Sequence, residues 1–193
     1  MQVYAVYYEQ SGRFLLGSKL KKGYYFYNSS TGKGEIKPNG QPLNGGGNFA
    51  LPGGKREGTE PITTAARREF TEETAAIIKE IETKEQTFSS GAYSAAYFKI
   101  ADSNFNTTVT NIIKTNLPQG LKARDDIINR TITAYNQIHQ KYPQAPQDNE
   151  LEEAYVWDVT DPEDWAQILK WKDDPVIGWY YEILEYLKLH ILN

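Results

Sequence analysis

The sequence predicts an α/β fold, in which strands rich in β-branched and aromatic residues alternate with amphipathic helices. Residues 2–8 open the chain with a strand-like run, and residues 62–79 favour helix because they contain neither glycine nor proline. Residues 175–192 place apolar side chains at helical spacing. Because 193 residues are many for one such domain and few for two, we expect a single domain, 1–193, with insertions at about 18–48 and 117–146.

Composition limits the classes of function. The net charge of −4 and the pI near 5.3 argue against duplex nucleic acid as a partner. We expect neither a signal peptide nor a membrane span, since no apolar run of about 18 residues occurs. The absence of cysteine excludes disulfides, thiolate nucleophiles and cysteine-based zinc sites. These features fit a cytoplasmic location.

The first strands are expected to form a hairpin. Residues 2–8 and 13–16 flank a turn signal at 10–12. A long glycine-rich stretch, 18–48, follows and carries four consecutive aromatic residues at 24–27, so we expect part of it to form a further strand pair. Two interpretations of the stretch stay open. It is either a lid or base-stacking wall over a substrate, or a hairpin whose tyrosines cover a sheet edge.

The most informative segment is residues 54–76, which read GKREGTEPITTAARREFTEETAA. The preceding Pro52-Gly53-Gly54 predicts a turn, and a second loop leads into a helix over 62–79. Thr59 is the expected N-cap of this helix, with Pro61 in the first turn, where its missing N–H costs little.

Acidic residues gather on one face of that helix. Glu69 and Glu73 lie at i,i+4, and Glu69 and Glu72 at i,i+3, so the three carboxylates are neighbours. They repel one another unless a cation lies among them, and a hard divalent cation such as Mg²⁺ suits oxygen ligands. The alternative is a solvated helix face on which Arg68 and Glu72 form an ordinary i,i+4 ion pair.

The segment fits the frame G-x5-E-x7-R-E-U-x-E-E-x-G-U, where U is a bulky apolar residue, and thereby resembles the Nudix box. The matching residues are Gly54, Glu60, Arg68, Glu69, Phe70, Glu72 and Glu73. The chain departs from the frame at Ala75, where the box has glycine, and at Ala76, which is small. We expect Ala75 to give a longer or tighter helix end without loss of catalysis.

The resemblance implies a Nudix-type α/β/α sandwich with a mixed sheet, and a hydrolase that cleaves a pyrophosphate linkage in a nucleoside diphosphate derivative. The substrate is left open among a nucleotide sugar, a dinucleoside polyphosphate and an NTP-like compound. Isoprenoid diphosphate isomerisation, a rival on a related fold, normally requires a cysteine, which this chain lacks. The other rival is a nucleotide-sensing module that has kept the box but not turnover.

The resemblance also implies roles for the box residues. The carboxylates of Glu69, Glu72 and Glu73 bind Mg²⁺, with Mn²⁺ as a substitute, and a carbonyl of the turn at Gly53 completes the metal's ligands. Arg68 pairs with Glu60 and orients the loop and the helix. The implied catalytic residues are Glu60, Arg68, Glu69, Glu72 and Glu73.

Two further strands, 79–88 and 92–100, are expected to pair around residues 89–91. Tyr93 lies beyond the box at about the distance where some Nudix proteins that bind diadenosine polyphosphates carry a tyrosine. It is either a substrate-stacking residue or a core residue that shares a strand face with Tyr97.

Residues 103–116 are rich in Asn and Thr and predict a loop or an irregular strand. Residues 121–142 show helical spacing up to Pro143 and predict an inserted amphipathic helix. This helix is expected to pack over the core or against a second subunit, so a homodimer is a possible assembly.

An acidic run, 147–153, leads into a strand predicted at 154–159. Nudix proteins often place an acidic loop before this strand, and a glutamate there serves as an extra metal ligand or general base. Glu150, Glu152 and Glu153 are the candidates for such a contact with metal or substrate. The alternative is a solvated acidic loop. A short helix at 165–169, capped from 161–164, and a C-terminal helix at 175–192 complete the expected elements.

Overall fold

A central mixed sheet organises the part of the chain that the computed structural model describes, residues 1–81 and 85–192. The strand order is β5-β2-β1-β8-β7, with β6 paired to β1 and β9 paired to β2, which makes a seven-stranded sheet. The strands are β1 (Gln2–Tyr8), β2 (Arg13–Lys19), β5 (Phe49–Ala50), β6 (Gly53–Lys55), β7 (Gln86–Ser90), β8 (Tyr93–Lys99) and β9 (Leu151–Asp158). β1 pairs in parallel with β8 and antiparallel with β2 and β6, so the predicted mixed sheet is confirmed.

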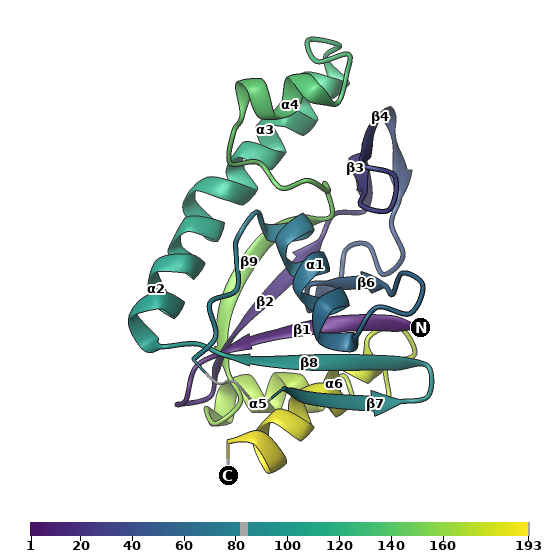
Figure 1. Cartoon of the computed structure of the whole chain (residues 1–193). Helices are drawn as coiled ribbons and strands as arrows, with labels where there is room; N and C mark the ends of the chain where they lie inside the picture. The colour runs from purple at the N-terminus through teal and green to yellow at the C-terminus, as the bar shows by residue number, and fades with distance from the viewer. Residues whose placement is uncertain (82–84, 193) are drawn as a thin grey trace.

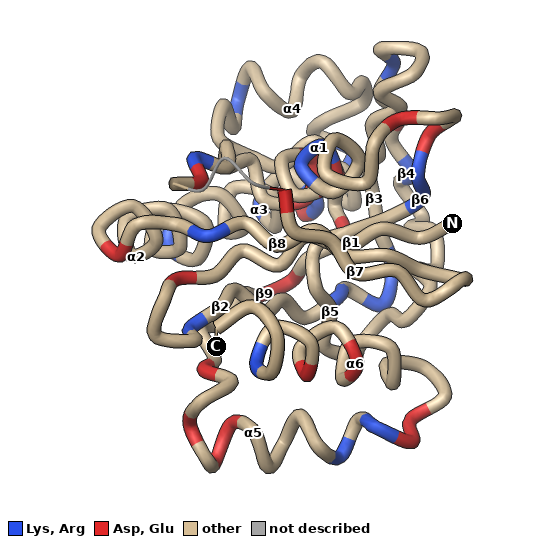
Figure 2. The backbone as a smooth tube through the Cα atoms, turned by 60° about the horizontal axis from the view of Figure 1, so that its bottom comes forward, with Lys and Arg blue, Asp and Glu red and all other residues tan. Residues whose placement is uncertain are grey.

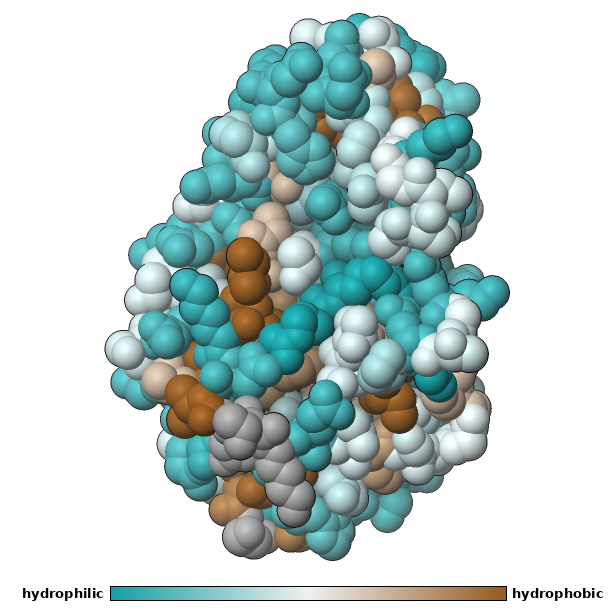
Figure 3. Space-filling view, viewed as in Figure 1, coloured by the Kyte–Doolittle hydropathy of each residue, from teal (hydrophilic) through white to brown (hydrophobic). Residues whose placement is uncertain are grey.

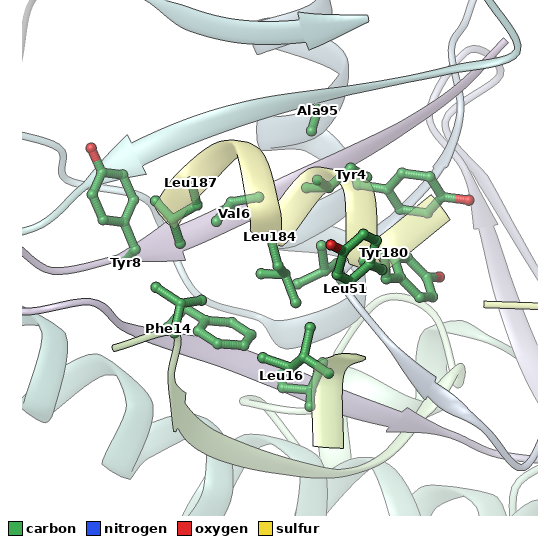
Figure 4. Close-up of a cluster of buried hydrophobic side chains, with 14 of the residues drawn as sticks. Tyr4, Val6, Tyr8, Phe14, Leu16, Leu51, Ala95, Tyr180, Leu184 and Leu187 are labelled. Carbon is green, nitrogen blue, oxygen red and sulfur yellow. The ribbon is translucent and has the colours of Figure 1, made fainter. Parts of the chain in front are cut away.

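Helices cover both faces of this sheet (Figure 1). α1 (Ile62–Thr74) and α2 (Asp102–Asn111) pack on one face, and α5 (Pro162–Leu169) and α6 (Gly178–Tyr186) on the other. In β1, Ala5 and Tyr7 join the core on the α1 side, whereas Val6 lies in the core beneath α6 (Figure 4). A strand covered on both faces must be apolar where it is covered, and β1 is apolar and buried from Val3 to Tyr8. The predicted α/β/α sandwich is therefore confirmed.

A second, two-stranded sheet stands apart from the central one. β3 (Lys22–Asn28) and β4 (Lys33–Pro42) pair antiparallel, which confirms the strand pair expected within 18–48. The hairpin packs on α3 (Leu117–Ile128) and α4 (Asn136–Lys141) through a cluster that includes Tyr25, Ile127 and Ile138 and is separate from both main cores. The two stretches in which insertions are expected thus form one unit, which we call the insertion lobe and which rises above the sheet in Figure 1.

Residues 103–116 are helical, so the predicted loop or irregular strand is wrong. α2 continues through one stretch of π-helix, η1 (Ile112–Asn116), into α3. Phe105, Val109 and Ile112 recur at about one helical turn and are buried against the sheet. This apolar stripe outweighs the low helix propensity of the Asn and Thr residues.

The helix predicted as continuous over 121–142 is interrupted. α3 begins earlier, at Leu117, and ends at Ile128, and α4 begins only at Asn136. Arg130, in the connection, has a left-handed φ of 60°, which a helix interior does not tolerate. The apolar spacing continues across this break because both helices pack on the β3–β4 hairpin.

The box helix α1 differs from its prediction at both ends. It begins at Ile62 with Pro61, not Thr59, at the cap position. It ends at Thr74 rather than near residue 79, because Ala75 adopts a left-handed φ of 56°. Ala75 therefore takes the backbone conformation that the glycine of the box would provide, and the expected longer or tighter helix end is wrong.

Most predicted strands are present. β1 and β2 form the opening hairpin, and β9 covers the strand predicted at 154–159. β7 pairs antiparallel with β8, as expected for the strands around 89–91. The strand predicted at 79–88 is shorter, since β7 begins at Gln86, and its part at 82–84 lies outside the described residues.

The C-terminal helices follow their predictions closely. The side chain of Asp161 accepts hydrogen bonds from the backbone N–H groups of Glu163 and Asp164 and so caps α5. α6 begins at Gly178 and continues into a second π-helical stretch, η2 (Leu187–Ile191). In the described parts of the chain, no helix has both the length and the apolar character that crossing a membrane requires.

Candidate active site

The loop that joins β5 to α1 includes the short strand β6, which lies very close to both β1 and α1. A Cβ atom at Gly53 would meet the carbonyl oxygen of Val3 at 2.3 Å. A Cβ atom at Gly54 would meet Oε2 of Glu69 at 2.5 Å. Because real Cβ contacts essentially never fall below 3.0 Å, glycine is what allows the loop to lie against the acidic face of the helix.

Arg68 connects this loop to the helix. Its guanidinium contacts Glu60 of the loop at 2.8 Å, and on α1 it contacts Glu69 at 2.8 Å and Glu72 at 3.1 Å. It also donates to the carbonyl of Lys55 at 3.2 Å. The hydrogen bond from Arg68 lowers the pKa of Glu60. The structure thus places the sequence-predicted pair in direct contact, and Figure 2 shows basic and acidic positions together on α1.

Glu73 is the most deeply buried of the box glutamates, with 1 % of its surface exposed. Its Oε1 accepts a hydrogen bond from the N–H of Gly53 at 3.3 Å, while its Oε2 is buried without a hydrogen-bond partner among the described residues. Burial, followed by the charge of Glu150, raises the pKa of Glu73. Burial also raises the pKa of Glu69 to about 7. A buried carboxylate oxygen without a partner is costly, and a cation would satisfy it.

Lys19 and Glu150 complete the charged cluster from the side of the sheet. Lys19 lies on β2, and its Nζ is 2.7 Å from Oε2 of Glu150. Burial alone would lower the pKa of Lys19, but the charges of Glu73 and Glu150 outweigh it and the pKa is raised. Of the acidic-loop candidates, Glu150 is therefore the one that the fold brings to the box.

The other candidates lie elsewhere. Glu152 and Glu153 are exposed on β9, and Glu153 accepts a hydrogen bond from the hydroxyl of Tyr155. Tyr93 lies at the start of β8 on the α6 side of the sheet, where its hydroxyl donates to Glu182 and its ring is 6.5 Å from that of Trp179. The structure does not bring these three residues to the carboxylates of α1.

Asp148 belongs to the site but was missed in the sequence. Its backbone N–H donates to the carbonyl of Glu72 at 3.0 Å, and its side chain accepts a hydrogen bond from the N–H of Tyr27. Burial raises its pKa to about 8. Asp148 stands in the same acidic run as Glu150, and this run is the sequence signal that points to it.

Two cavities flank the loop, and Lys55 lines both of them. The polar cavity, of about 480 Å³, lies between the insertion lobe and α1, and its lining includes Tyr27, Asn28, Arg56, Arg68 and Asp148. The aromatic cavity, of about 550 Å³, lies on the other side, and its lining includes Tyr4, Lys19, Phe26, Phe49, Glu150 and Trp179. Figure 3 shows the hydrophilic band that crosses the face over α1 below the insertion lobe.

The donor set fits a hard divalent cation in its chemistry. All the acidic groups offer oxygen, and Oε2 of Glu73 is buried without a partner. Across residues 1–81 and 85–192, however, no three His, Cys, Asp or Glu side chains converge as a metal-binding group. Arg68 contacts both Glu69 and Glu72, so these two carboxylates must turn from the guanidinium to join Glu73 around one ion.

Comparison with family models and with curated proteins finds no match. Comparison with solved structures finds a mutT/nudix family protein from Listeria innocua, 15 % identical, with a TM-score of 0.45 over 98 % of this chain and 90 % of that one. A NUDIX hydrolase from Nitrosomonas europaea is 16 % identical, with a TM-score of 0.40 over 100 % and 94 % of the two chains. A MutT protein from Methanosarcina mazei Go1 is 25 % identical, with a TM-score of 0.29 over 52 % and 64 %.

Proposed function

We propose that this chain is a Mg²⁺-dependent hydrolase of the Nudix type, which cleaves a pyrophosphate linkage in a nucleoside diphosphate derivative. The observation that carries the proposal is the contact of one guanidinium, that of Arg68, with the loop residue Glu60 and the helix residues Glu69 and Glu72. An ordinary i,i+4 surface pair would leave Arg68 and Glu72 exposed, but their side chains are only 17 % and 6 % exposed. Burial of the whole network favours a built site over a solvated face.

The cation would be held by Glu69, Glu72 and Glu73, with Glu150 and the carbonyl of Gly53 as further candidates. Mg²⁺ bound there supplies neutralisation of the phosphate oxygens and a water of lowered pKa, and Mn²⁺ is a chemically reasonable substitute. The unpartnered Oε2 of Glu73 supports this placement.

The chain's own residues position the reactants and move the proton. Arg68 keeps the loop against α1, so that Gly53 stays beside Glu73. Lys55 lines both cavities and is placed to bind a phosphate that bridges them. The proton of the attacking water passes to a carboxylate of the cluster. Asp148, whose pKa burial raises to about 8, is not among the proposed cation ligands and is the carboxyl group matched to that role near neutral pH.

The direct test is hydrolysis of a nucleotide panel by the purified chain, with Mg²⁺ and with a chelator in place of Mg²⁺. The proposal expects release of a nucleoside monophosphate from at least one compound, and loss of that release with the chelator. Turnover unaffected by the chelator would overturn the metal dependence, and no turnover of any compound would overturn the activity.

A nucleotide-sensing module is the second candidate. It is favoured by the lack of a converged metal-binding group among the described residues. Calorimetry on the same compounds separates the candidates, because a sensor would bind a nucleotide tightly without cleaving it. Weak binding of a nucleotide together with its turnover would exclude the sensor.

A further inference from the structure

Lys19 is a buried lysine that the proposed hydrolysis does not use. It is the last residue of β2, and its backbone is fixed on both sides. Its N–H donates to the carbonyl of Asn48, and its carbonyl accepts from the N–H of Gly47, each at 2.9 Å. Its side chain is only 15 % exposed and forms the 2.7 Å ion pair with Glu150. The carbonyl of Glu150 in turn accepts from the N–H of Leu20 at 2.8 Å, so both partners of the ion pair are held in place.

This ion pair lies beside the carboxylates of the box. Lys19 and Glu150 line the aromatic cavity together with Gly53, whose N–H donates to Oε1 of Glu73 at 3.3 Å. After burial, the charge of Glu150 is the largest influence that raises the pKa of Glu73. The charge of Lys19 is the next largest influence and lowers the same pKa. Both charges therefore act directly on the carboxylate whose Oε2 has no hydrogen-bond partner among the described residues.

The ion pair removes a carboxylate that a second cation would need. The three carboxylates of α1 are enough for one Mg²⁺, which keeps several waters among its ligands. A second ion would share those carboxylates and draw on a neighbouring one. Glu150 is such a neighbour, but its Oε2 is taken by Lys19. Asp148 is another, and its side chain already accepts a hydrogen bond from the N–H of Tyr27.

The charge of Lys19 opposes a second cation in addition. A lysine ammonium is a compact point charge, and its repulsion of another cation grows as the effective dielectric falls in a partly buried site. A cation held by Glu69, Glu72 and Glu73 has three carboxylates to offset this repulsion. A second ion at Glu150 would instead lie against the ammonium that Glu150 binds.

We propose that Lys19 is a built-in cation that takes the place of a second divalent ion, so that the chain without substrate binds one divalent cation per molecule. Glu150 is then held as the partner of Lys19 and does not join the ligands of that cation. This inference rests on the proposed function, because it assumes the cation site on α1.

The test counts the Mn²⁺ ions bound per chain in the absence of nucleotide. The metal-free protein is titrated with Mn²⁺, and the free ion is measured by its electron paramagnetic resonance signal. The parent is expected to bind one ion. If the parent binds two ions of similar affinity, Lys19 excludes nothing and the inference fails while the hydrolase stands. If the parent binds none, the cation site of the proposed function fails and the inference fails with it.

The count in Lys19→Met tests the lysine itself. Methionine keeps an unbranched side chain but removes the charge and frees Glu150, so the count should rise from one ion to two. Lys19→Gln is also neutral, and it gives the same expected count if the methionine variant does not fold. A count of one in a folded neutral variant would overturn the inference.

Three controls separate this effect from a general change of charge. Lys19→Arg keeps the positive charge and should bind one ion. Lys33→Met removes an exposed lysine of β4 and should also bind one ion. Lys19→Met combined with Glu150→Gln should return the count to one, because the second ion loses the carboxylate that Lys19 had occupied. Two ions in Lys33→Met or in the double variant would contradict the role given to the ion pair.

Discussion

At the scale of single residues, Ala75 has the backbone of a glycine. Its φ of 56° brings Cβ toward the following carbonyl, which costs an L-residue about 1–2 kcal/mol. The Nudix box has glycine at this position, and the presence of alanine led us to predict a longer or tighter helix end. The fold instead keeps the conformation and accepts the strain, because the buried Thr74 and Ala76 fix the chain on either side.

Ala75→Gly should therefore stabilise the protein by about 0.5–1 kcal/mol, after the extra entropy of glycine in the unfolded chain is subtracted. Urea unfolding measures this, and kcat should not change. Ala76→Gly is the matched control and should destabilise, since Ala76 is not left-handed. A lower stability of Ala75→Gly would contradict the account of the helix end.

Arg68→Ala should lower kcat by about a hundredfold and change KM little, because Glu60 loses its partner and the loop no longer holds its position against α1. Arg67→Ala is the control, since Arg67 contacts Glu80 and not the box glutamates. Steady-state kinetics on the best substrate decide the matter. An increase in KM alone would make Arg68 a substrate contact instead.

The buried carboxyls make metal-free stability depend on pH. The pKa of Glu69 is raised by burial from 4.5 to about 7, and that of Asp148 from 3.8 to about 8. Between these values the unfolded chain has released protons that the folded protein still holds, so stability falls as pH rises from about 4 to about 8. Asp148→Asn should reduce the loss of Tm between pH 6 and pH 8.5 in the presence of a chelator. An unchanged Tm difference would show that Asp148 does not titrate in this window.

At the scale of elements, the strands and the box helix were predictable because their patterns are local. Alternating or continuous apolar runs predicted β1, β8 and β9. The glycines predicted the turn at which the candidate site begins. The helical stretch formed by α2 and η1 was missed because Asn and Thr dominate the composition of residues 103–116, whereas its apolar stripe is narrow. The break at Arg130 was also missed, since apolar spacing continues on both sides of it.

The same helix supports the box from outside. Asn116, in the π-helical stretch, donates from its side chain to the carbonyl of Thr74 at 2.9 Å, at the last turn of α1. π-helical stretches within helices often mark functional positions. Asn116→Ala should cost about 1–2 kcal/mol of stability and lower kcat through a displaced Glu73, with KM nearly unchanged. Asn111→Ala, an exposed position one turn earlier, is the control for urea unfolding and kinetics. Equal losses in both variants would remove the special role of Asn116.

At the scale of the whole molecule, the site lies where the sandwich and the insertion lobe meet. Asp148 bridges them, since it contacts Tyr27 of the lobe and Glu72 of α1. No local pattern pairs residues so distant in sequence, so the acidic run could be noticed but not placed. The same reason explains why Glu150, Glu152 and Glu153 were equal candidates until β9 fixed which of them faces Lys19.

The central claim is that the buried carboxylates of α1 hold the cation that makes hydrolysis possible, and Glu73→Gln tests it most directly. The substitution removes a carboxyl group whose pKa is raised by burial and by the charge of Glu150. The metal-free variant should therefore fold and be at least as stable as the parent. Exposed Glu153→Gln serves as the matched control. The account predicts that Glu73→Gln loses Mg²⁺-dependent release of nucleoside monophosphate to below about a tenth of the parent kcat, while Glu153→Gln keeps it. A Glu73→Gln protein that retains more than this, with the same dependence on Mg²⁺, would contradict the claim.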